Sequence, residues 1–178
     1  MRSTVLLASR SCLVDAGHGP RYDAALDPIA RRELDEVVAG VWLPLEVARA
    51  HYRACDSLNL SASAITTIGR MTNDRMKGIL YGTFIRVFQE AGGSPWNVLP
   101  QWQRFWDRAY DGGAMRVTKL GPKDARVDLI GCALCESHYY RQALRGLSAG
   151  FIEVLCTRAY ATEVASSLDG VSYRYQWA

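Results

Sequence analysis

Cys132 and Cys135 form a C-x-x-C pair, and His138 follows three residues later. Such a pair at the start of a helix is typical of a redox dithiol, because that position lowers a thiol pKa. With two further ligands the same spacing is typical of structural zinc. A thioredoxin-type dithiol lies in a strand–helix–strand unit near the start of a chain, whereas this pair follows a predicted hairpin near the end. The other three cysteines are isolated in the sequence. We therefore expect buried thiols here, with redox and metal sites as open alternatives.

The three histidines have no acid or nucleophile at a spacing typical of catalysis. His51 lies within a predicted helix, His18 lies in a glycine-rich loop and His138 lies in the first turn of another helix. We expect His51 to lie on a helix face or at an interface, because a neutral histidine is often partly buried. No Ser-His-Asp order, G-x-S-x-G, P-loop or G-x-G-x-x-G occurs. The sequence therefore predicts a protein that is not an enzyme.

Aromatic residues are densest between 96 and 110. Trp102 and Trp106 are four residues apart in a predicted helix, so they share a face. That face either packs on the core or lines a cavity or an interface. If a cavity is present, we expect its ligand to contact five residues: Trp102, Trp106, Met76, Tyr81 and Tyr140.

Two pairs of glycines lie inside predicted helices at four-residue spacing, Gly78 with Gly82 and Gly146 with Gly150. A glycine inside a helix costs about 1 kcal/mol relative to alanine, so a compensating gain is expected. Close packing of two helices would supply that gain. Room for a slender apolar ligand between the helices is the alternative.

The composition is that of a soluble globular protein of one domain, covering residues 1–178. The chain is 49% hydrophobic and 22% charged, with a net charge of +3. The basic residues alternate with acids, so we expect neither nucleic-acid binding nor membrane insertion. The five cysteines are an odd number and widely spaced, and the apolar run 5–8 is too short for a signal peptide. We expect a cytoplasmic protein with reduced thiols.

Hydrophobic periodicity divides the chain into a helical part, 27–110, and a hairpin–helix–hairpin part, 114–178. The expected helices cover 27–40, 43–58, 61–90, 94–110 and 135–157, and the expected hairpins cover 114–131 and 160–178. A strand is expected at 3–14, where apolar residues partly alternate. Segregated helices and antiparallel strands predict the α+β class, with the sheet packed on helices.

The motifs along this order resemble those of an uncharacterised family of proteins of about this length, described mainly from myxobacteria. The matching stretches are W-x-P-x-E-x-A-x-A-H-Y at 42–52, S-P-W at 94–96, W-x-x-x-W-D at 102–107, the hairpin 116–131, Y-Y-R-Q-A-L-R-G-x-x-x-G at 139–150 and a final hairpin ending in Trp177. That family is similar, from about residue 61 onward, to a superfamily with three branches. These are the 4-vinyl-reductase domains, the haem-NO-binding domains and the TRAPP-type vesicle-tethering subunits.

The resemblance implies an α+β domain that holds a small or apolar ligand in a cavity, or that dimerises through its helices. Haem-NO-binding domains carry a Y-x-S-x-R motif, which this sequence lacks, and 168–177 has no cysteine cluster of the 4-vinyl-reductase kind. We therefore expect no cofactor. The sequence predicts a non-enzymatic domain that binds or senses an apolar small molecule as a homodimer. A scaffold subunit and a thiol redox or metal protein that uses Cys132 and Cys135 are the alternatives.

Overall fold

The computed structural model describes residues 1–76 and 93–178, and it confirms the α+β class. The expected ligand contact Tyr81 and the pair Gly78 and Gly82 lie outside the described residues. The described helices are α1 (Ser3–Asp15), α2 (Gly19–Ala25), α3 (Pro28–Glu36), α4 (Leu45–Asp56), α5 (Ala62–Met76), α7 (Pro95–Val98), α8 (Trp102–Ala109) and α9 (His138–Ile152), with 3-10 turns η2 (Leu99–Gln101), η3 (Ala133–Glu136) and η4 (Glu153–Leu155). The strands are β1 (Ala114–Gly121), β2 (Asp124–Ile130), β3 (Ala159–Ser166) and β4 (Gly170–Trp177).

The N-terminal segment is a helix, so the strand predicted at 3–14 is wrong. Along α1 the buried positions include Leu6, Ser9 and Leu13, which recur every three or four residues. This is helical spacing. The strand was predicted from the large apolar residues alone. That pattern leaves out the small Ser9, which is also buried.

The next helices are shorter than expected at both ends. The helix predicted at 27–40 is α3, which ends at Glu36, and the helix predicted at 43–58 is α4. Asp27 begins α3, because its carboxylate accepts from the amides of Ile29 and Ala30 at 2.9 and 3.1 Å. Gly40, expected to end the helix, lies in the following loop with a φ of 93°, a conformation that suits glycine.

The single helix predicted at 94–110 is divided in two. The turn η2 separates α7 from α8 and contains Pro100, which has no N–H to donate to the preceding turn. Within α8, Trp102, Phe105 and Trp106 are all buried, at the three- and four-residue spacing of one helix face.

The helix expected at 135–157 begins three residues later, at His138, and ends at Ile152. The Ser137 hydroxyl accepts from the amide of Tyr140 at 3.0 Å, and Asp56 at the end of α4 accepts from the amide of Tyr139 at 2.7 Å. A hydroxyl and a carboxylate thus occupy the positive end of α9, a stabilising arrangement.

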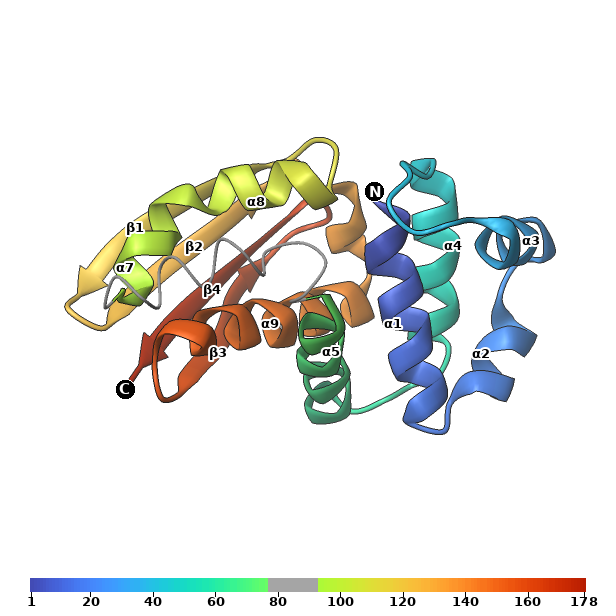
Figure 1. The fold of residues 1–178 in the computed structure, drawn as a ribbon, viewed down its shortest axis with the longest axis horizontal. Helices are drawn as coiled ribbons and strands as arrows, with labels where there is room; N and C mark the ends of the chain where they lie inside the picture. Colours follow the sequence, from blue (N-terminus) through green and yellow to red (C-terminus); the bar gives the residue numbers. More distant parts are fainter. Residues whose placement is uncertain (77–92) are drawn as a thin grey trace.

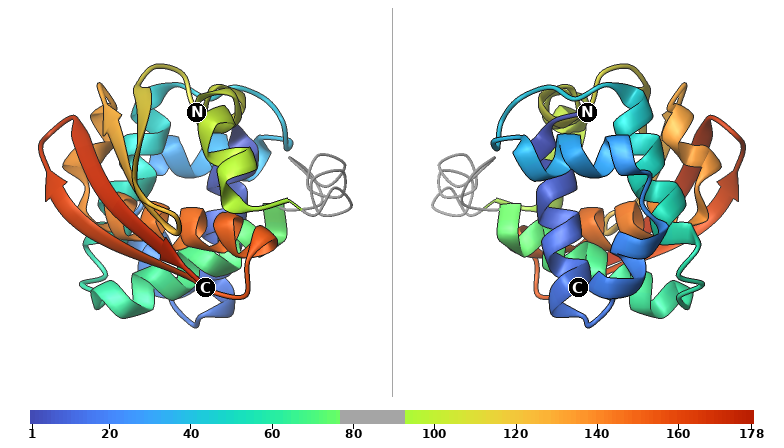
Figure 2. Two further views of the ribbon diagram at one scale, coloured as in Figure 1. Left: turned by 90° about the vertical axis from the view of Figure 1, so that its left-hand side faces the viewer. Right: turned by 90° about the vertical axis from the view of Figure 1, so that its right-hand side faces the viewer.

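The two hairpins are confirmed and form one antiparallel sheet in the order β1-β2-β4-β3. The register sets Val127 opposite Tyr173 and Ala125 opposite Tyr175, and all four are buried. Figure 2 shows the sheet at one side of the molecule, with α8 and α9 covering its inner face. The outer face carries charged residues such as Arg126 and Arg174, which lie opposite each other in the register.

Two helices cross closely at the centre of the molecule, α5 and α9 (Figure 1). A Cβ on Gly69 would overlap the carbonyl oxygen of Ala143, and a Cβ on Gly146 would overlap that of Thr66. The close packing expected for Gly146 and Gly150 is therefore present, and α5 is the partner. Gly69, the glycine of α5 that faces α9, was not among the glycines predicted to lie at a helix contact. The crossing joins the helices α1–α4 to the sheet.

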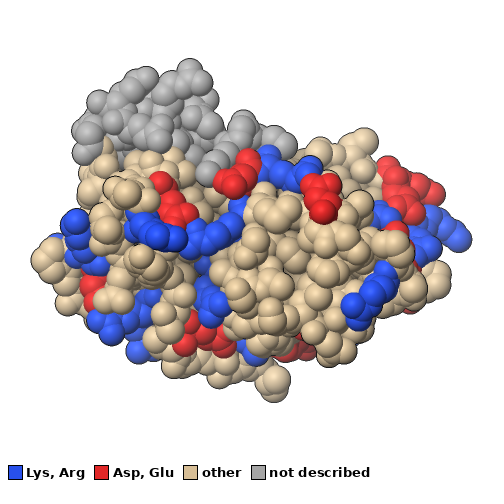
Figure 3. All heavy atoms as spheres, turned by 90° about the horizontal axis from the view of Figure 1, so that it is seen from below, with Lys and Arg blue, Asp and Glu red and all other residues tan. Residues whose placement is uncertain are grey.

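The charged residues do not form a continuous field of one sign on the face shown in Figure 3, where acidic and basic side chains alternate. Several are paired, for example Arg141 with Glu163 and Arg174 with Asp124. Among the described residues there is no helix whose length and apolar character would let it cross a bilayer.

Candidate functional site

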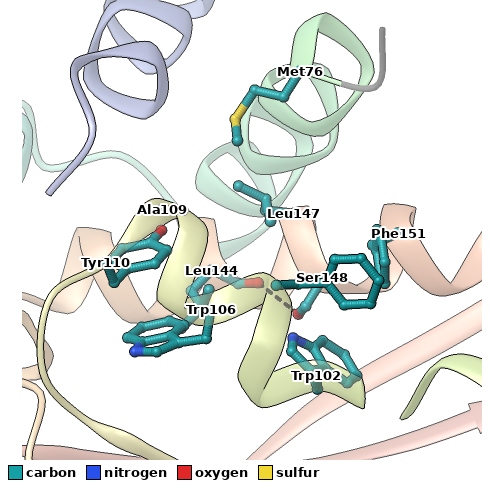
Figure 4. A pocket seen from close by; sticks show the side chains of 10 residues that line it. Met76, Trp102, Trp106, Ala109, Tyr110, Leu144, Leu147, Ser148 and Phe151 are labelled. Carbon is teal, nitrogen blue, oxygen red and sulfur yellow. Dashed lines mark hydrogen bonds between the residues drawn. The ribbon is translucent and has the colours of Figure 1, made fainter. Parts of the chain in front are cut away.

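A small apolar cavity lies where α8 faces α9 and the end of α5 (Figure 4). Its volume is about 40 Å³. The lining residues are Met76 from α5, Trp102, Phe105, Trp106, Ala109 and Tyr110 from α8 and its end, and Leu144, Leu147, Ser148 and Phe151 from α9. Apart from one tyrosine and one serine, the side chains that surround the space are apolar.

The structure brings three of the five expected ligand contacts together here. Met76, Trp102 and Trp106 line the cavity. Tyr140 lines a neighbouring space of about 20 Å³ instead. The two spaces share a wall formed by Tyr110, Leu144 and Leu147. A water molecule occupies about 30 Å³ of liquid volume. Each space could therefore hold only one or a few non-hydrogen atoms of a ligand.

The walls are held by aromatic contacts. The rings of Trp106 and Tyr110 are stacked 3.8 Å apart at an interplanar angle of 8°, and Trp106 Nε1 donates to the carbonyl of Gly112 at 2.8 Å. Trp102 is 6.1 Å from Phe151, centroid to centroid. The Ser148 hydroxyl donates to Leu144 and lies 2.6 Å from the Tyr175 hydroxyl. The Ser148 hydroxyl therefore already has hydrogen-bond partners within the protein.

Sequence reasoning missed Asn73. This residue lies one helical turn before Met76 and is fully buried, and neither atom of its amide has a hydrogen-bond partner among the described residues. A Cβ on Gly150, between the cavity residues Leu147 and Phe151, would stand 2.9 Å from its amide nitrogen. A buried amide without partners costs about 1–3 kcal/mol. Nothing in the sequence distinguishes Asn73 from the other polar residues of that helix.

The histidines lie away from this cavity. His51 is fully buried in α4, with the Tyr22 hydroxyl 2.7 Å from Nδ1 and the Ser9 hydroxyl 3.0 Å from Nε2. Burial is the largest cause that lowers its pKa, to about 3, and the nearby Arg10 charge lowers it further. His18 is half-buried and His138 is exposed. In the described segments no three His, Cys, Asp or Glu side chains are placed to hold a metal ion together.

Cys132 and Cys135 are both buried, at the two ends of the turn that leads into α9. The amide of Cys135 donates to the carbonyl of Cys132 at 3.0 Å, and the Cys132 thiol donates to the Tyr140 hydroxyl at 3.6 Å. The pair therefore lies before the helix, rather than within it, and is in contact with one residue that also lines the second space.

No family model matches the chain, and no curated protein matches it. Its fold is similar to that of solved H-NOX proteins. The Fe(II) unliganded H-NOX protein from K. algicida has a TM-score of 0.70 at 8% identity, covering 100% of this chain and 97% of that one. A mutant H-NOX protein from S. oneidensis in the Fe(II) ligation state has a TM-score of 0.65 at 8% identity, covering 100% and 96%. A structure from work on haem distortion in the H-NOX family has a TM-score of 0.63 at 14% identity, covering 99% and 95%. At these identities the likeness establishes the fold.

The described residues do not fit a haem group. The side chains that bind haem iron in proteins are His, Cys, Met and Tyr. Met76 and Tyr110 line the cavity, but none of the chain's three histidines does, and both ring nitrogens of His51 already have partners. The volume of about 40 Å³ is also far below the roughly 300–1,000 Å³ of pockets for large ligands.

Proposed function

We propose that this chain is a non-enzymatic domain that binds or senses a small, mainly apolar molecule between α5, α8 and α9. The observation that carries the proposal is the apolar cavity between the three helices. Asn73 does not line the cavity, but its buried amide has no partner among the described residues and lies against Gly150, between the lining residues Leu147 and Phe151. A well-packed core leaves few such voids, and it rarely leaves a buried amide without a partner. A ligand would remove both costs.

The cavity volume sets the size of the ligand. An engineered cavity of about 150 Å³ holds benzene or xenon, whereas this one is about 40 Å³. A molecule of a few heavy atoms therefore fits with small movements of the side chains. The apolar part of that molecule would lie against Trp102 and Met76, and the same movements would let one hydrogen-bonding group reach the amide of Asn73 behind the lining.

Filling the cavity is expected to abolish binding of an apolar probe. Xenon is the probe, and binding is read from the fluorescence of the tryptophans and from a rise in melting temperature under xenon pressure. Ala109→Leu adds a larger side chain inside the cavity, and the response to xenon should be lost. Ala24→Leu makes the same change on an exposed face of α2 and should respond as the wild type does. An unchanged response in Ala109→Leu would contradict the proposal.

Replacing Asn73 with leucine is expected to separate stability from ligand recognition. The variant removes a buried amide that has no partner, so the free energy of unfolding should rise by about 1 kcal/mol, measured by urea denaturation. The xenon response should remain, because xenon forms no hydrogen bond. The response to small alcohols and amides should fall. A variant less stable than the wild type would show that the amide is hydrogen-bonded in solution.

A dimeric interaction subunit is the second candidate, favoured by the loop between α3 and α4. Large apolar side chains are exposed in this loop and at the first residue of α4: Val38, Val41, Trp42 and Leu45. Contiguous exposed apolar residues mark association surfaces in soluble proteins. Sedimentation analysis tests this candidate: we expect a dimer that Val38→Asp converts to a monomer. The relation to the 4-vinyl-reductase and TRAPP-type branches stays a prediction.

A further inference from the structure

We propose that Cys132 and Cys135 are a redox-active dithiol, in which Cys132 attacks a hydroperoxide and Cys135 then closes an intrachain disulfide. This inference is independent of the ligand cavity, and it revives an alternative that the sequence alone left open.

The turn that holds the two cysteines has the dimensions of a disulfide bridge. The amide of Cys135 donates to the carbonyl of Cys132 at 3.0 Å, which closes a four-residue turn. Turns of this kind hold their end Cα atoms within about 7 Å, and disulfides span Cα separations of about 4.4–6.8 Å. The largest influence on the pKa of each thiol is the side chain of the other, so the two sulfurs lie close together. The bridge can therefore form with little movement of the backbone.

Four groups can donate to the Cys132 sulfur once it has lost its proton. The Cys135 thiol has the largest effect on the Cys132 pKa, and the backbone amides of Leu134 and Cys135 add to it. The Tyr140 hydroxyl accepts from the Cys132 thiol at 3.6 Å and can turn to donate to the thiolate. Hydrogen bonds to a thiolate stabilise it over the thiol. They outweigh burial, which acts in the opposite direction, and lower the Cys132 pKa to about 7. The same shared hydrogen bond, with burial, raises the pKa of Cys135.

The two cysteines therefore have different roles. A partly ionised Cys132 is the nucleophile, since the thiolate is the reactive form, and the protonated Cys135 is the resolving thiol. Two of the other cysteines contrast with Cys132: burial raises the pKa of both Cys55 and Cys156. Arg141 donates to the carbonyl of Cys135 at 2.6 Å and holds the turn against α9.

The chemistry balances with a hydroperoxide as the oxidant. The Cys132 thiolate attacks the terminal oxygen, an S–O bond forms, the O–O bond breaks, and the alcohol or water leaves with a proton. The Cys135 sulfur then attacks the sulfenic acid on Cys132. The S–S bond forms, the S–O bond breaks, and hydroxide leaves with the Cys135 proton as water. Two thiols and one hydroperoxide thus give one disulfide, one water and one alcohol.

The test uses the full reduced chain, hydrogen peroxide as the probe and mass spectrometry. Trypsin releases both cysteines in one peptide, 127–141, because it cleaves after Arg126 and after Arg141 and no other Lys or Arg lies between them. After peroxide and alkylation we expect this peptide to lack two hydrogens, to carry no alkyl group, and to recover both alkyl groups after a thiol reductant. A 127–141 peptide that stays doubly alkylated while Cys156 is oxidised would overturn the proposal.

Two variants assign the roles. Cys135→Ser should stop at a sulfenic acid on Cys132, trapped by dimedone, whereas Cys132→Ser should give no dimedone adduct at Cys135. Cys55→Ser is the matched control and should form the disulfide as the wild type does. An adduct at Cys135 in Cys132→Ser would overturn the assignment.

Tyr140→Phe tests the positioning residue by a measurement that loss of packing alone would not change. Alkylation of Cys132 in the wild type should reach half its limiting rate near pH 7. The variant should move that midpoint upward, because one donor to the thiolate is removed. A midpoint above pH 8 in the wild type would overturn the proposal.

Discussion

Replacing Gly146 with alanine is expected to destabilise the protein by about 3 kcal/mol or more. The new Cβ would overlap the carbonyl oxygen of Thr66 on α5. A backbone atom cannot rotate away, so the two helices must separate. Alanine favours helix over glycine by about 1 kcal/mol, and the predicted loss occurs despite that gain. Total stabilities are about 5–15 kcal/mol, so the variant should unfold at much lower urea concentration.

Gly150→Ala is the matched control in the same helix. Its Cβ would meet the Asn73 side chain, at 2.9 Å from the amide nitrogen, and a side chain can move. We expect a far smaller loss in the same urea titration, followed by circular dichroism. Equal stability of Gly146→Ala and the wild type would show that α5 and α9 are further apart in solution than in this structure.

Acidification is expected to remove several kcal/mol of stability through His51. In the folded protein its pKa is lowered to about 3, mainly by burial, whereas the unfolded value is about 6.5. Between these values the unfolded chain binds a proton that the native state does not, so stability falls as the pH falls. The stability that neutral His51 contributes is fully present above pH 6.5. As the pH falls from 6.5 toward 3, it decreases by about 1.4 kcal/mol for each pH unit.

Comparing two His→Gln variants isolates this effect from the titration of the carboxylates. His51→Gln leaves a neutral amide beside Tyr22 and Ser9, so it should be less stable at pH 7 and should lose the slope that His51 adds. His138→Gln changes an exposed residue and should keep the wild-type slope. Urea titrations at intervals from pH 7 to 4 measure both. An identical slope in all three proteins would show that His51 is protonated in the native state.

The hairpins were the most predictable part of the fold, because each strand pairs with its neighbour along the chain. Alternation in β1 and β2 around Gly121 and Pro122 is a local signal, and local signals are visible in a sequence. The pairing of β2 with β4 is not local, and it follows only once α9 is known to lie on one face of the sheet. The error in α1 arose because burial of Ser9 depends on α4, which places His51 against it.

The candidate site was predictable in part for a similar reason. The four-residue spacing of Trp102 and Trp106 indicated a shared face, and the structure places that face against α9. Tyr140 belongs to the neighbouring space, since the cap at Ser137 fixes where α9 begins and hence which way each residue of it points. Asn73 could not be found, because a polar residue in a helix usually faces water. The donors around Cys132 likewise come from the tertiary fold.

The close crossing of α5 and α9 at Gly69 and Gly146 also affects how quickly the chain can fold. Arg145 of α9 donates to Thr66 of α5 across 79 residues of sequence, so the crossing closes a long loop before it gains any contact. Chains rich in such distant contacts fold slowly. A nascent chain on the ribosome has its first five helices long before α9 emerges. Until then the glycine face of α5 has no partner, and that interval is when the chain most needs protection from aggregation.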